Sequence, residues 1–597
     1  MFSALARRLR LNARGRTATL ASLIGVMLLA TIGATAVLTT HKVKADTLQA
    51  TAIVNDNVAH SNLSSTSYGV NTAAWDSNLT DGTTANMLGQ AGVQIMRYPG
   101  GSTADNFHWY NQTVTYTSDT GIAGSGDLGD NFCGSGCGVN FDQFMNVLQQ
   151  AGQGPGYINY GSSPQAMITV NYGSGSLQEA ADWVAYANTN DNYCYSSGCL
   201  QFAPTYSGSN PNGNAYGIHF WEVGNEVYGD GTYNSGGVGQ TWELNQNGIG
   251  PTNYANGVIA YSQAMKAVDP TISIGAVLTA PGNWPDSANA PVPNPNSPDG
   301  RAGWNQTVLQ NACSAIDFVD VHWYPQAPAG SNNGTEGDSQ LLMSPQNGIA
   351  DHSRTPNIAK MMQTLQNQIN TYCNHPVQVM ITETNSVYGN PGKQTTSVTN
   401  ALFAADDVMT WLENGAVNVD LWAAHNSPFD GNISSSLEGN TDFGDFGMLS
   451  RGMCTANGAC EPPAETPFPT YWGMALLGWM GVTSGWDVIG TATSSTPNVS
   501  VHVAYREGYN WNTNQWTWSP ELLLINKDPT NAYSDTVSMD RSVNDTALGW
   551  VFGPDYNSDP SGNTPMSQPS GGAMAVNGSS ITVTVPPYSM EMIDMYN

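Results

Sequence analysis

Two glutamates stand at the ends of apolar runs, where a carboxylate is unusual. Glu226 closes the run IHFWEVGNE (218–226), and Glu383 lies near the end of VQVMITETN (377–385). A carboxylate that follows a buried strand needs a reason, because a surface loop could hold it without desolvation. Hydrolysis of a glycosidic bond uses such a pair: one acid protonates the leaving oxygen, and one carboxylate attacks or stabilises the anomeric carbon. Glu226 and Glu383 are therefore candidate catalytic residues.

These two runs belong to a series of eight between about residues 65 and 480. The eight apolar or β-branched runs are 67–75, 93–99, 166–173, 218–226, 272–279, 317–325, 377–385 and 417–425. Amphipathic stretches typical of helices lie between them at 177–188, 254–269, 357–372 and 398–415, and a last one covers 469–481. Strands that alternate with helices predict an α/β fold with a parallel sheet, and eight repeats favour its closure into a (β/α)8 TIM barrel. In such a barrel, strands four and seven carry Glu226 and Glu383 to the same end, where they can face each other.

The two ends of the chain differ in character from this middle part. From Trp486 the apolar pattern has a period of two, with candidate strands at 499–506, 521–527 and 580–595. This pattern predicts a C-terminal antiparallel β-sandwich, to which the segment 48–56 adds a strand. We therefore expect four parts: a signal peptide (1–45), an N-terminal strand of the sandwich (46–64), the catalytic barrel (65–483) and the sandwich domain (484–597).

The first 45 residues are typical of an export signal. Five arginines lead into the uncharged run 20–38, and small residues follow at 34–36 and 43–45. A basic start, an apolar run and a small-residue exit indicate a cleaved secretory signal peptide and an extracellular protein. The run is long, so an uncleaved membrane anchor is the alternative.

The composition excludes several classes of function. The chain has 46 Asp and Glu against 17 Lys and Arg, a formal charge of −29. Such a surface repels phosphate backbones and anionic lipids, so we expect no nucleic acid and no membrane as partner, unless the N-terminal segment is an anchor. A glycine-rich phosphate loop, zinc-ligand spacing and a Ser-His-Asp pattern do not stand out, and we expect neither cofactor nor metal.

The eight cysteines suit an oxidising compartment. Six form close pairs in loops of small residues, Cys133/Cys137, Cys194/Cys199 and Cys454/Cys460, and Cys313 and Cys373 would pair by elimination. Metal binding is the alternative, but no His stands at ligand spacing and C-x-x-C is absent. We expect four structural disulfides.

Four motifs resemble those of a known group of enzymes. The words WEVGNE (221–226), VHWYP (321–325) and ITETN (381–385) resemble glycoside hydrolases of clan A, and RYPGGSTADNFHW (97–109) is similar to the motif of family 51 α-L-arabinofuranosidases. Ser102 departs from the Asn usual in family 51, and GGSTAD is also similar to β-glucuronidase and heparanase relatives.

The resemblance implies roles for the motif residues. Glu226 would be the general acid/base and Glu383 the nucleophile of a retaining reaction. Asn225 would bind the hydroxyl beside the anomeric carbon, and Tyr324 and Arg97 would lie beside Glu383. A cation and a phenol there would keep Glu383 ionised, while Glu226 stays protonated near a second carboxylate.

Other polar and aromatic residues close the strands as well, and each has a structural alternative. His322 could bind substrate or a backbone carbonyl, and Arg97 could form a buried ion pair. Trp422 and His425 close strand eight, where an aromatic ring could stack on a sugar or pack in the core. Asp105 and Asn171 could bind hydroxyls or support loops. Glu222, deeper in strand four, is expected to form a buried ion pair.

Together these features predict a secreted retaining glycoside hydrolase that acts on a poly- or oligosaccharide of plant type. α-L-Arabinofuranosidase is the leading activity. An endo-β-1,4-glucanase, xylanase or β-glucuronidase on the same fold is the first alternative, and a non-catalytic carbohydrate-binding protein is the second. The sequence leaves the oligomeric state open.

Overall fold

A computed structural model describes most of the chain after residue 45. The described residues are 46–55, 61–62, 65–114, 137–153, 163–189, 194–195, 198–205, 215–229, 250–283, 303–326, 337–350, 355–430, 442–482, 488–510, 515–540, 546–554 and 574–595. Thr47–Asn597 forms one compact unit, separate from Met1–Asp46. The expected signal segment lies outside the described residues. Within the described ranges, no helix has the length and apolarity that crossing a membrane would need.

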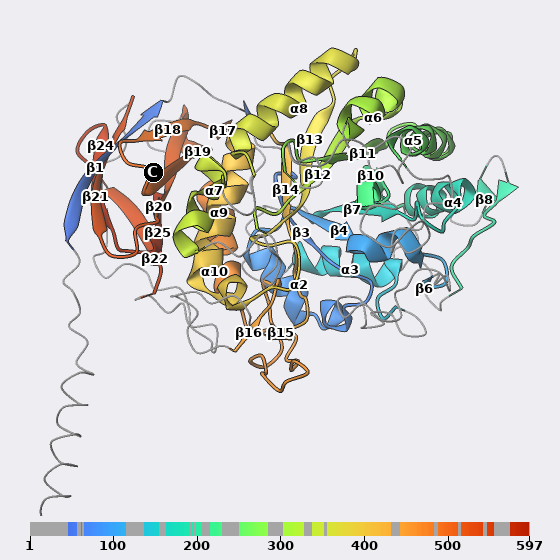
Figure 1. The fold of residues 1–597 in the computed structure, drawn as a ribbon, viewed down its shortest axis with the longest axis horizontal. Coiled ribbons are helices and arrows are strands. Elements are labelled where there is room, and N and C mark those ends of the chain that lie inside the picture. Colours follow the sequence, from blue (N-terminus) through green and yellow to red (C-terminus); the bar gives the residue numbers. More distant parts are fainter. Residues whose placement is uncertain are drawn as a thin grey trace, which may run out of the picture. The chain divides into compact units, whose positions relative to one another are not determined.

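Eight parallel strands close into a barrel in the order of the chain (Figure 1). They are β3 (Tyr68–Asn71), β4 (Ile95–Tyr98), β7 (Gln165–Val170), β10 (Phe220–Val223), β11 (Ser273–Thr279), β12 (Phe318–Trp323), β13 (Gln378–Thr384) and β14 (Asn418–Leu421). β14 pairs in parallel with β3 and so completes the ring. The predicted (β/α)8 barrel is confirmed, and each of the eight predicted runs overlaps one of its strands.

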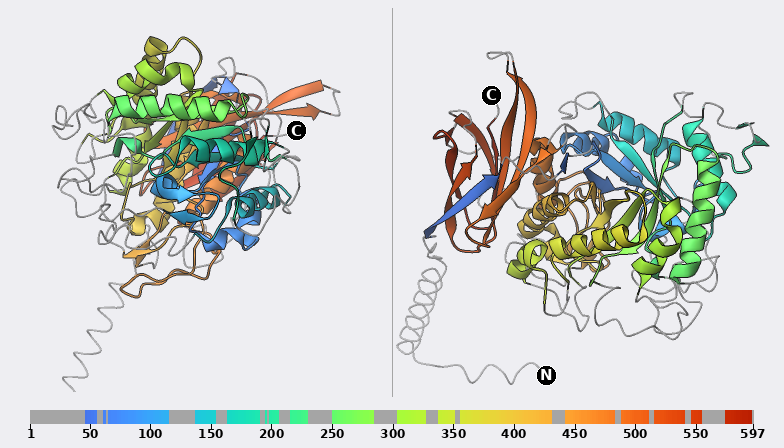
Figure 2. Two further views of the ribbon diagram at one scale, coloured as in Figure 1. Left: turned by 90° about the vertical axis from the view of Figure 1, so that its right-hand side faces the viewer. Right: turned by 90° about the horizontal axis from the view of Figure 1, so that it is seen from above.

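Helices enclose these strands (Figure 2). They are α2 (Thr83–Gln90), α3 (Phe141–Ala151), α4 (Leu177–Asn188), α5 (Pro251–Lys266), α6 (Trp304–Ala312), α7 (Asp338–Asn347), α8 (Ile358–Tyr372), α9 (Val398–Glu413) and α10 (Pro469–Leu477). The five predicted helices correspond to α4, α5, α8, α9 and α10, the last of which continues as a π-helical turn, Gly478–Val482. The helices α2, α3, α6 and α7 are additions to the prediction.

The barrel interior changes from apolar to polar along its axis. One end is filled by a cluster of large apolar side chains, which we call the floor: Ile95, Met167, Phe220, Phe318 and Met380. Further along the strands, on the same inward face, stand Arg97, Thr169, Glu222 and Asp320, all buried. Interiors of TIM barrels are usually filled by branched apolar residues in layers, so this polar layer points to the active-site end.

Apart from three two-stranded sheets, the remaining described strands form two sheets that pack face to face. One is β18 (Thr491–Ser494), β1 (Thr47–Asn55), β21 (Ala532–Met539) and β24 (Ser580–Val585). The other is β2 (Ser61–Asn62), β17 (Val488–Ile489), β19 (Val499–Asn510), β20 (Gln515–Asn526), β25 (Ser589–Asp594), β22 (Thr546–Phe552) and β23 (Met574–Ala575). Alternate residues of both sheets, such as Val54, Val503 and Val537, share one apolar core. The pairing is antiparallel except between β1 and β21, which run parallel.

A buried charge network ties this sandwich to the barrel. Asp406 of α9 accepts a 2.6 Å contact from Lys527 Nζ and lies 2.8 Å from His502 Nε2. His502 Nδ1 in turn lies 2.8 Å from Glu413 Oε1. Because a buried charge is stable only when it is paired, separating the sandwich from the barrel would break these ion pairs and cost free energy.

The structure contains two of the expected disulfides, Cys313–Cys373 and Cys454–Cys460. Cys137 is also disulfide-bonded, and its predicted partner Cys133 lies outside the described residues. The backbones of Cys194 and Cys199 pair in the hairpin of β8 (Cys194–Tyr195) and β9 (Gly198–Cys199), while their side chains are outside the description.

Candidate active site

A tight turn after β10 brings Glu226 to the barrel rim. Gly224 has φ +80°, and a Cβ there would meet Val227 at 2.6 Å, so only glycine fits. The backbone N–H of Asn225 donates to Asp105 Oδ2 at 3.0 Å, which fixes the turn. Glu226 itself has φ +44°, a backbone conformation that costs a non-glycine residue about 1–3 kcal/mol.

Glu383 lies at the end of β13, where the register with β12 shifts by one residue. Its Oε1 accepts a hydrogen bond from Arg97 Nη1 at 2.7 Å, and its Oε2 accepts one from the Tyr324 hydroxyl at 2.8 Å. Burial raises the pKa of Glu383, while His322 and Arg97 act in the opposite direction. The expected neighbours are therefore present, but the loss of solvent outweighs them in setting the pKa.

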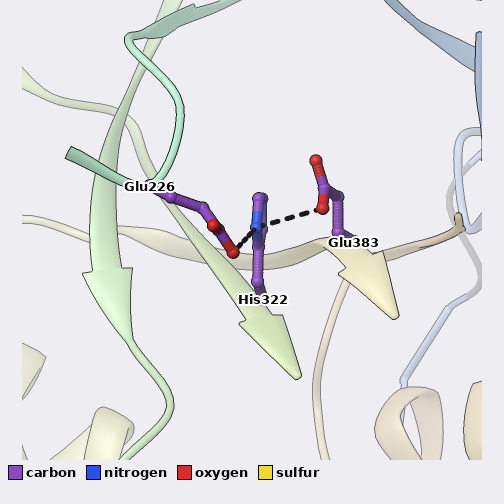
Figure 3. A group of neighbouring side chains, drawn as sticks. All are labelled: Glu226, His322 and Glu383. Atoms are coloured by element: carbon purple, nitrogen blue, oxygen red, sulfur yellow. Dashed lines mark hydrogen bonds and ion pairs between the residues drawn. The ribbon is translucent and has the colours of Figure 1, made fainter. Parts of the chain in front are cut away.

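His322 stands between the two glutamates (Figure 3). Its Nδ1 lies 2.9 Å from Glu226 Oε1 and 3.3 Å from Glu383 Oε2. Although burial disfavours the charged ring, Glu383 and Glu226 raise the pKa of His322 above its usual value. The imidazole nitrogen Nδ1 thus faces the two glutamates and not a backbone carbonyl.

Arg97 organises the site from below. Its Nε contacts Glu222 Oε2 at 2.6 Å, and Nη2 donates to Asn225 Oδ1 at 2.9 Å, in addition to the bond to Glu383. Glu222 is completely buried and also accepts from Thr169 Oγ1. Arg97 therefore forms the buried ion pair expected of Glu222 and contacts Glu383 as well.

Three predicted binding residues have their polar atoms engaged elsewhere. His425 is buried between Asp76 Oδ2 (2.8 Å) and Glu465 Oε2 (3.3 Å). Asn171 Oδ1 accepts from the backbone N–H groups of Ser174 and Gly175, and Asp105 accepts from that of Asn225. These contacts favour the structural alternative for all three residues.

Trp422 remains a candidate sugar-stacking residue. It is only partly buried and packs against Val387 and Phe446. Its ring lies over Gly101, where a Cβ would come within 2.8 Å of the indole. The glycine of the RYPGG motif therefore makes room for this ring.

Two contacts at the site were not predicted. The Tyr228 hydroxyl donates to Glu226 Oε1 at 3.0 Å, and Asn71 Oδ1 accepts from Arg97 Nη1 at 2.9 Å. Asn71 ends the run YGVN, so the same signal that marked Glu226 could have found it. Tyr228 follows the turn, where strand periodicity carries no information.

The arrangement suits a pair of carboxylates that act on one bond. One oxygen of Glu226, one of Glu383 and a nitrogen of His322 lie within 4.8 Å of one another. Retaining glycosidases place their two carboxyl groups about 5–5.5 Å apart, whereas inverting enzymes need a wider gap. The same three atoms could in principle ligate a metal ion, but the guanidinium of Arg97, 2.7 Å from Glu383, would repel a dication there.

Comparison with known sequences finds partial relatives. No family model matches the chain. A probable α-L-arabinofuranosidase C from Aspergillus clavatus is 24% identical over 248 residues, which cover 39% of this chain and 37% of that protein. The chain thus matches well under half the length of this relative.

Solved structures resemble the chain over nearly its whole length. The family 51 arabinofuranosidase from Xanthomonas axonopodis pv. citri has a TM-score of 0.58 at 13% identity and covers 92% of this chain and 100% of its own. A bifunctional glucanase-xylanase from a metagenome library has a TM-score of 0.55 at 17% identity and covers 92% and 99%. At such identities these likenesses show a shared fold. Sequence and fold together show that the chain resembles clan A glycoside hydrolases of the family 51 group.

Proposed function

We propose that the protein is a retaining glycoside hydrolase with α-L-arabinofuranosides of plant-type polysaccharide as its leading substrates. The observation that carries this proposal is the pair Glu226 and Glu383, bridged by His322, with Arg97 and Tyr324 on the second glutamate. The sequence resemblance to α-L-arabinofuranosidases supports the choice of sugar.

In the first step, Glu383 attacks the anomeric carbon and Glu226 protonates the leaving oxygen. Arg97 and Tyr324 hold the nucleophile by one hydrogen bond to each oxygen, which fixes its direction. When Glu383 becomes an ester, its negative charge is lost and Glu226 gives up its proton more readily. Glu226 then deprotonates the water that releases the sugar, with retention of configuration.

A second candidate is an endo-acting enzyme on β-linked glucan or xylan. The similar fold of the glucanase-xylanase favours it, because the same barrel supports both kinds of activity. A β-glucuronidase is the remaining alternative, based on the GGSTAD motif (100–105). In all three cases the catalytic pair is the same and the sugar differs.

Hydrolysis of aryl arabinofuranoside, xyloside, glucoside and glucuronide, with xylan and β-glucan in parallel, tests the proposal. The arabinofuranoside should be hydrolysed with the highest kcat/KM, and Glu383→Gln should abolish its hydrolysis. If another glycoside or a polymer were hydrolysed faster, the proposed substrate would be wrong, but the proposed reaction, hydrolysis of a glycosidic bond, would stand. Binding of these sugars without hydrolysis would indicate a carbohydrate-binding protein instead.

We also propose that the mature protein is extracellular. The N-terminal segment has the pattern of a signal peptide, and structural disulfides such as Cys313–Cys373 suit an oxidising compartment. Expression of the full chain in a secreting host should give a product in the medium that starts near Asp46. A product that stays with the membrane would indicate an anchor.

A further inference from the structure

The barrel interior beneath the catalytic pair holds polar atoms without hydrogen-bond partners. Both carboxylate oxygens of Asp320, Oε1 of Glu222 and Oγ1 of Thr382 are buried, and no described residue bonds to them. Buried polar atoms of this kind cost free energy unless a partner satisfies them. The floor of Phe318 and its neighbours closes this layer on one side, and the catalytic pair closes it on the other.

His322 has a complementary need. Its Nδ1 faces the two glutamates, whereas its Nε2 is buried and has no partner among the described residues. Glu383 and Glu226 raise the pKa of His322 and so favour the charged ring, which carries a proton on each nitrogen. A buried N–H donor therefore points away from the catalytic pair without an acceptor.

Asp320 is placed to meet that need. Asp320 and His322 are two residues apart on β12 and so lie on the same, inward face as Phe318 of the floor. The charges that act on Asp320 come from Glu222 of β10, His322, Arg97 of β4 and Glu383 of β13. The hydroxyl of Tyr254 on α5 is also close enough to sense Asp320.

The protonation of Asp320 follows from these surroundings. Burial, and after it the neighbouring Glu222, raise the pKa of Asp320 well above its ordinary value. A neutral carboxylic acid has one O–H donor and a free carbonyl oxygen, so it can donate to one neighbour and accept from another. An ionised carboxylate beside Glu222 could only accept.

We propose that Asp320 is a positioning residue: as a neutral acid it donates toward Glu222 Oε1 and accepts from His322 Nε2–H through one ordered water. These bonds satisfy the unpartnered atoms of all three residues at once. They connect the Arg97–Glu222 ion pair to the imidazole that bridges Glu226 and Glu383, and so hold that imidazole in its charged form. The catalytic benefit rests on the proposed function, but the link itself does not.

The titration of His322 tests the link without reference to catalysis. The full chain is labelled with 13C at Cε1 of its nine histidines, and the His322 signal is the one that His322→Gln removes. Asp320→Asn keeps a neutral acceptor and should leave the pKa of His322 within about 0.3 units of the wild type. Asp320→Ala removes the acceptor and should lower the pKa of His322 by about one unit or more.

Asp420→Asn is the matched control. Asp420 also has a buried oxygen without a partner, but it lies on β14, away from β12. This variant should not move the His322 titration. If Asp320→Ala does not fold, Asp320→Val, which is closer to aspartate in size, takes its place.

Each other outcome overturns the proposal. An equal decrease in Asp320→Asn and Asp320→Ala would mean that Asp320 acts as an ionised carboxylate. No change in either would mean that Asp320 is not the partner of His322, and a decrease as large in Asp420→Asn would indicate a general effect of the polar layer. A wild type that hydrolyses no glycoside would refute the proposed function and leave the titration result valid.

Discussion

Each of the two candidate catalytic glutamates accepts a hydrogen bond from one tyrosine. Tyr324 donates to Glu383 Oε2 and Tyr228 donates to Glu226 Oε1. Hydrogen bonds to charged groups are worth about 1.5–3 kcal/mol, so Tyr324→Phe should lower kcat/KM by roughly 10- to 100-fold on every substrate. Tyr228→Phe removes a hydrogen bond to Glu226, the proposed general acid. The resulting decrease in kcat/KM should grow as the leaving group becomes more basic.

The measurement is kcat/KM over a series of aryl glycosides whose phenols differ in pKa. Tyr471→Phe is the control, since that hydroxyl donates to the carbonyl of Met87 outside the site. If both tyrosine variants at the site showed the same dependence on the leaving group, the two glutamates would not have separate roles.

At the residue scale, a polar residue at a strand end can be predicted to reach the end of the barrel, but the residues that it contacts cannot be predicted in this way. The strand-end pattern predicts that Glu226 and Glu383 reach the same end of the barrel, and they meet there. The resemblance implies Arg97 and Tyr324 beside Glu383, and both contact it. The pattern does not show that His425 has a structural role, because its partners Asp76 and Glu465 come from distant parts of the chain. Polar residues at a strand end satisfy loops as readily as they bind ligands.

At the scale of elements, the packing of α10 on α9 depends on one glycine. A Cβ at Gly473 would lie 2.5 Å from the carbonyl oxygen of Ala401, a backbone atom that cannot move alone. Gly473→Ala should therefore destabilise the protein by about 1–3 kcal/mol, even though alanine favours helices by about 1 kcal/mol.

Chemical denaturation of the purified variant measures this loss. Gly138→Ala is the matched control, because a Cβ there would meet its nearest neighbour at 3.9 Å. If the two variants had the same free energy of unfolding, α9 and α10 would be able to move apart with little loss of stability.

Most of the predicted helices are longer than the missed ones, although the missed α3 has a regular apolar face and a capping box at Asn140 that the sequence could have revealed. The long helices α5, α8 and α9 have regular apolar faces, and each predicted strand is a nearly continuous apolar run. The missed helix α7 contains Pro345, and α2 has only eight residues and begins after a glycine. The period-two pattern predicts one strand over 580–595, but Pro586 and Pro587 separate β24 from β25.

At the scale of the whole molecule, several buried carboxyls favour acidic conditions. Burial raises the pKa of Glu591 to about 7 and that of Asp535 to about 6. A carboxyl whose pKa is higher in the folded state stabilises the fold below its unfolded pKa, and this stability is lost as pH rises through the folded value. The free energy of unfolding should therefore fall between about pH 5 and 8.

Glu591→Gln should reduce this dependence, by at most about 3 kcal/mol over that range. Thermal or denaturant unfolding at several pH values measures it. Asp540→Asn, which removes an exposed carboxylate of the same domain, should leave the dependence unchanged. A steep loss of stability from pH 7 down to 5 would contradict the account. The acidic composition predicts an excess of carboxyl groups. It does not predict which of them are buried with a raised pKa, because the surroundings of each carboxyl depend on the packing.

Azide rescue of the two glutamate variants tests the central claim, that Glu383 is the nucleophile and Glu226 the acid/base, most directly. In Glu226→Ala an aryl glycoside with an activated phenol should still form the glycosyl-enzyme, which accumulates because no base activates water. Azide needs no base, so it should restore turnover and give a glycosyl azide of retained configuration. Glu383→Ala should not regain turnover with retention. A glycosyl azide of inverted configuration from Glu226→Ala, or full activity of either variant, would contradict the assignment.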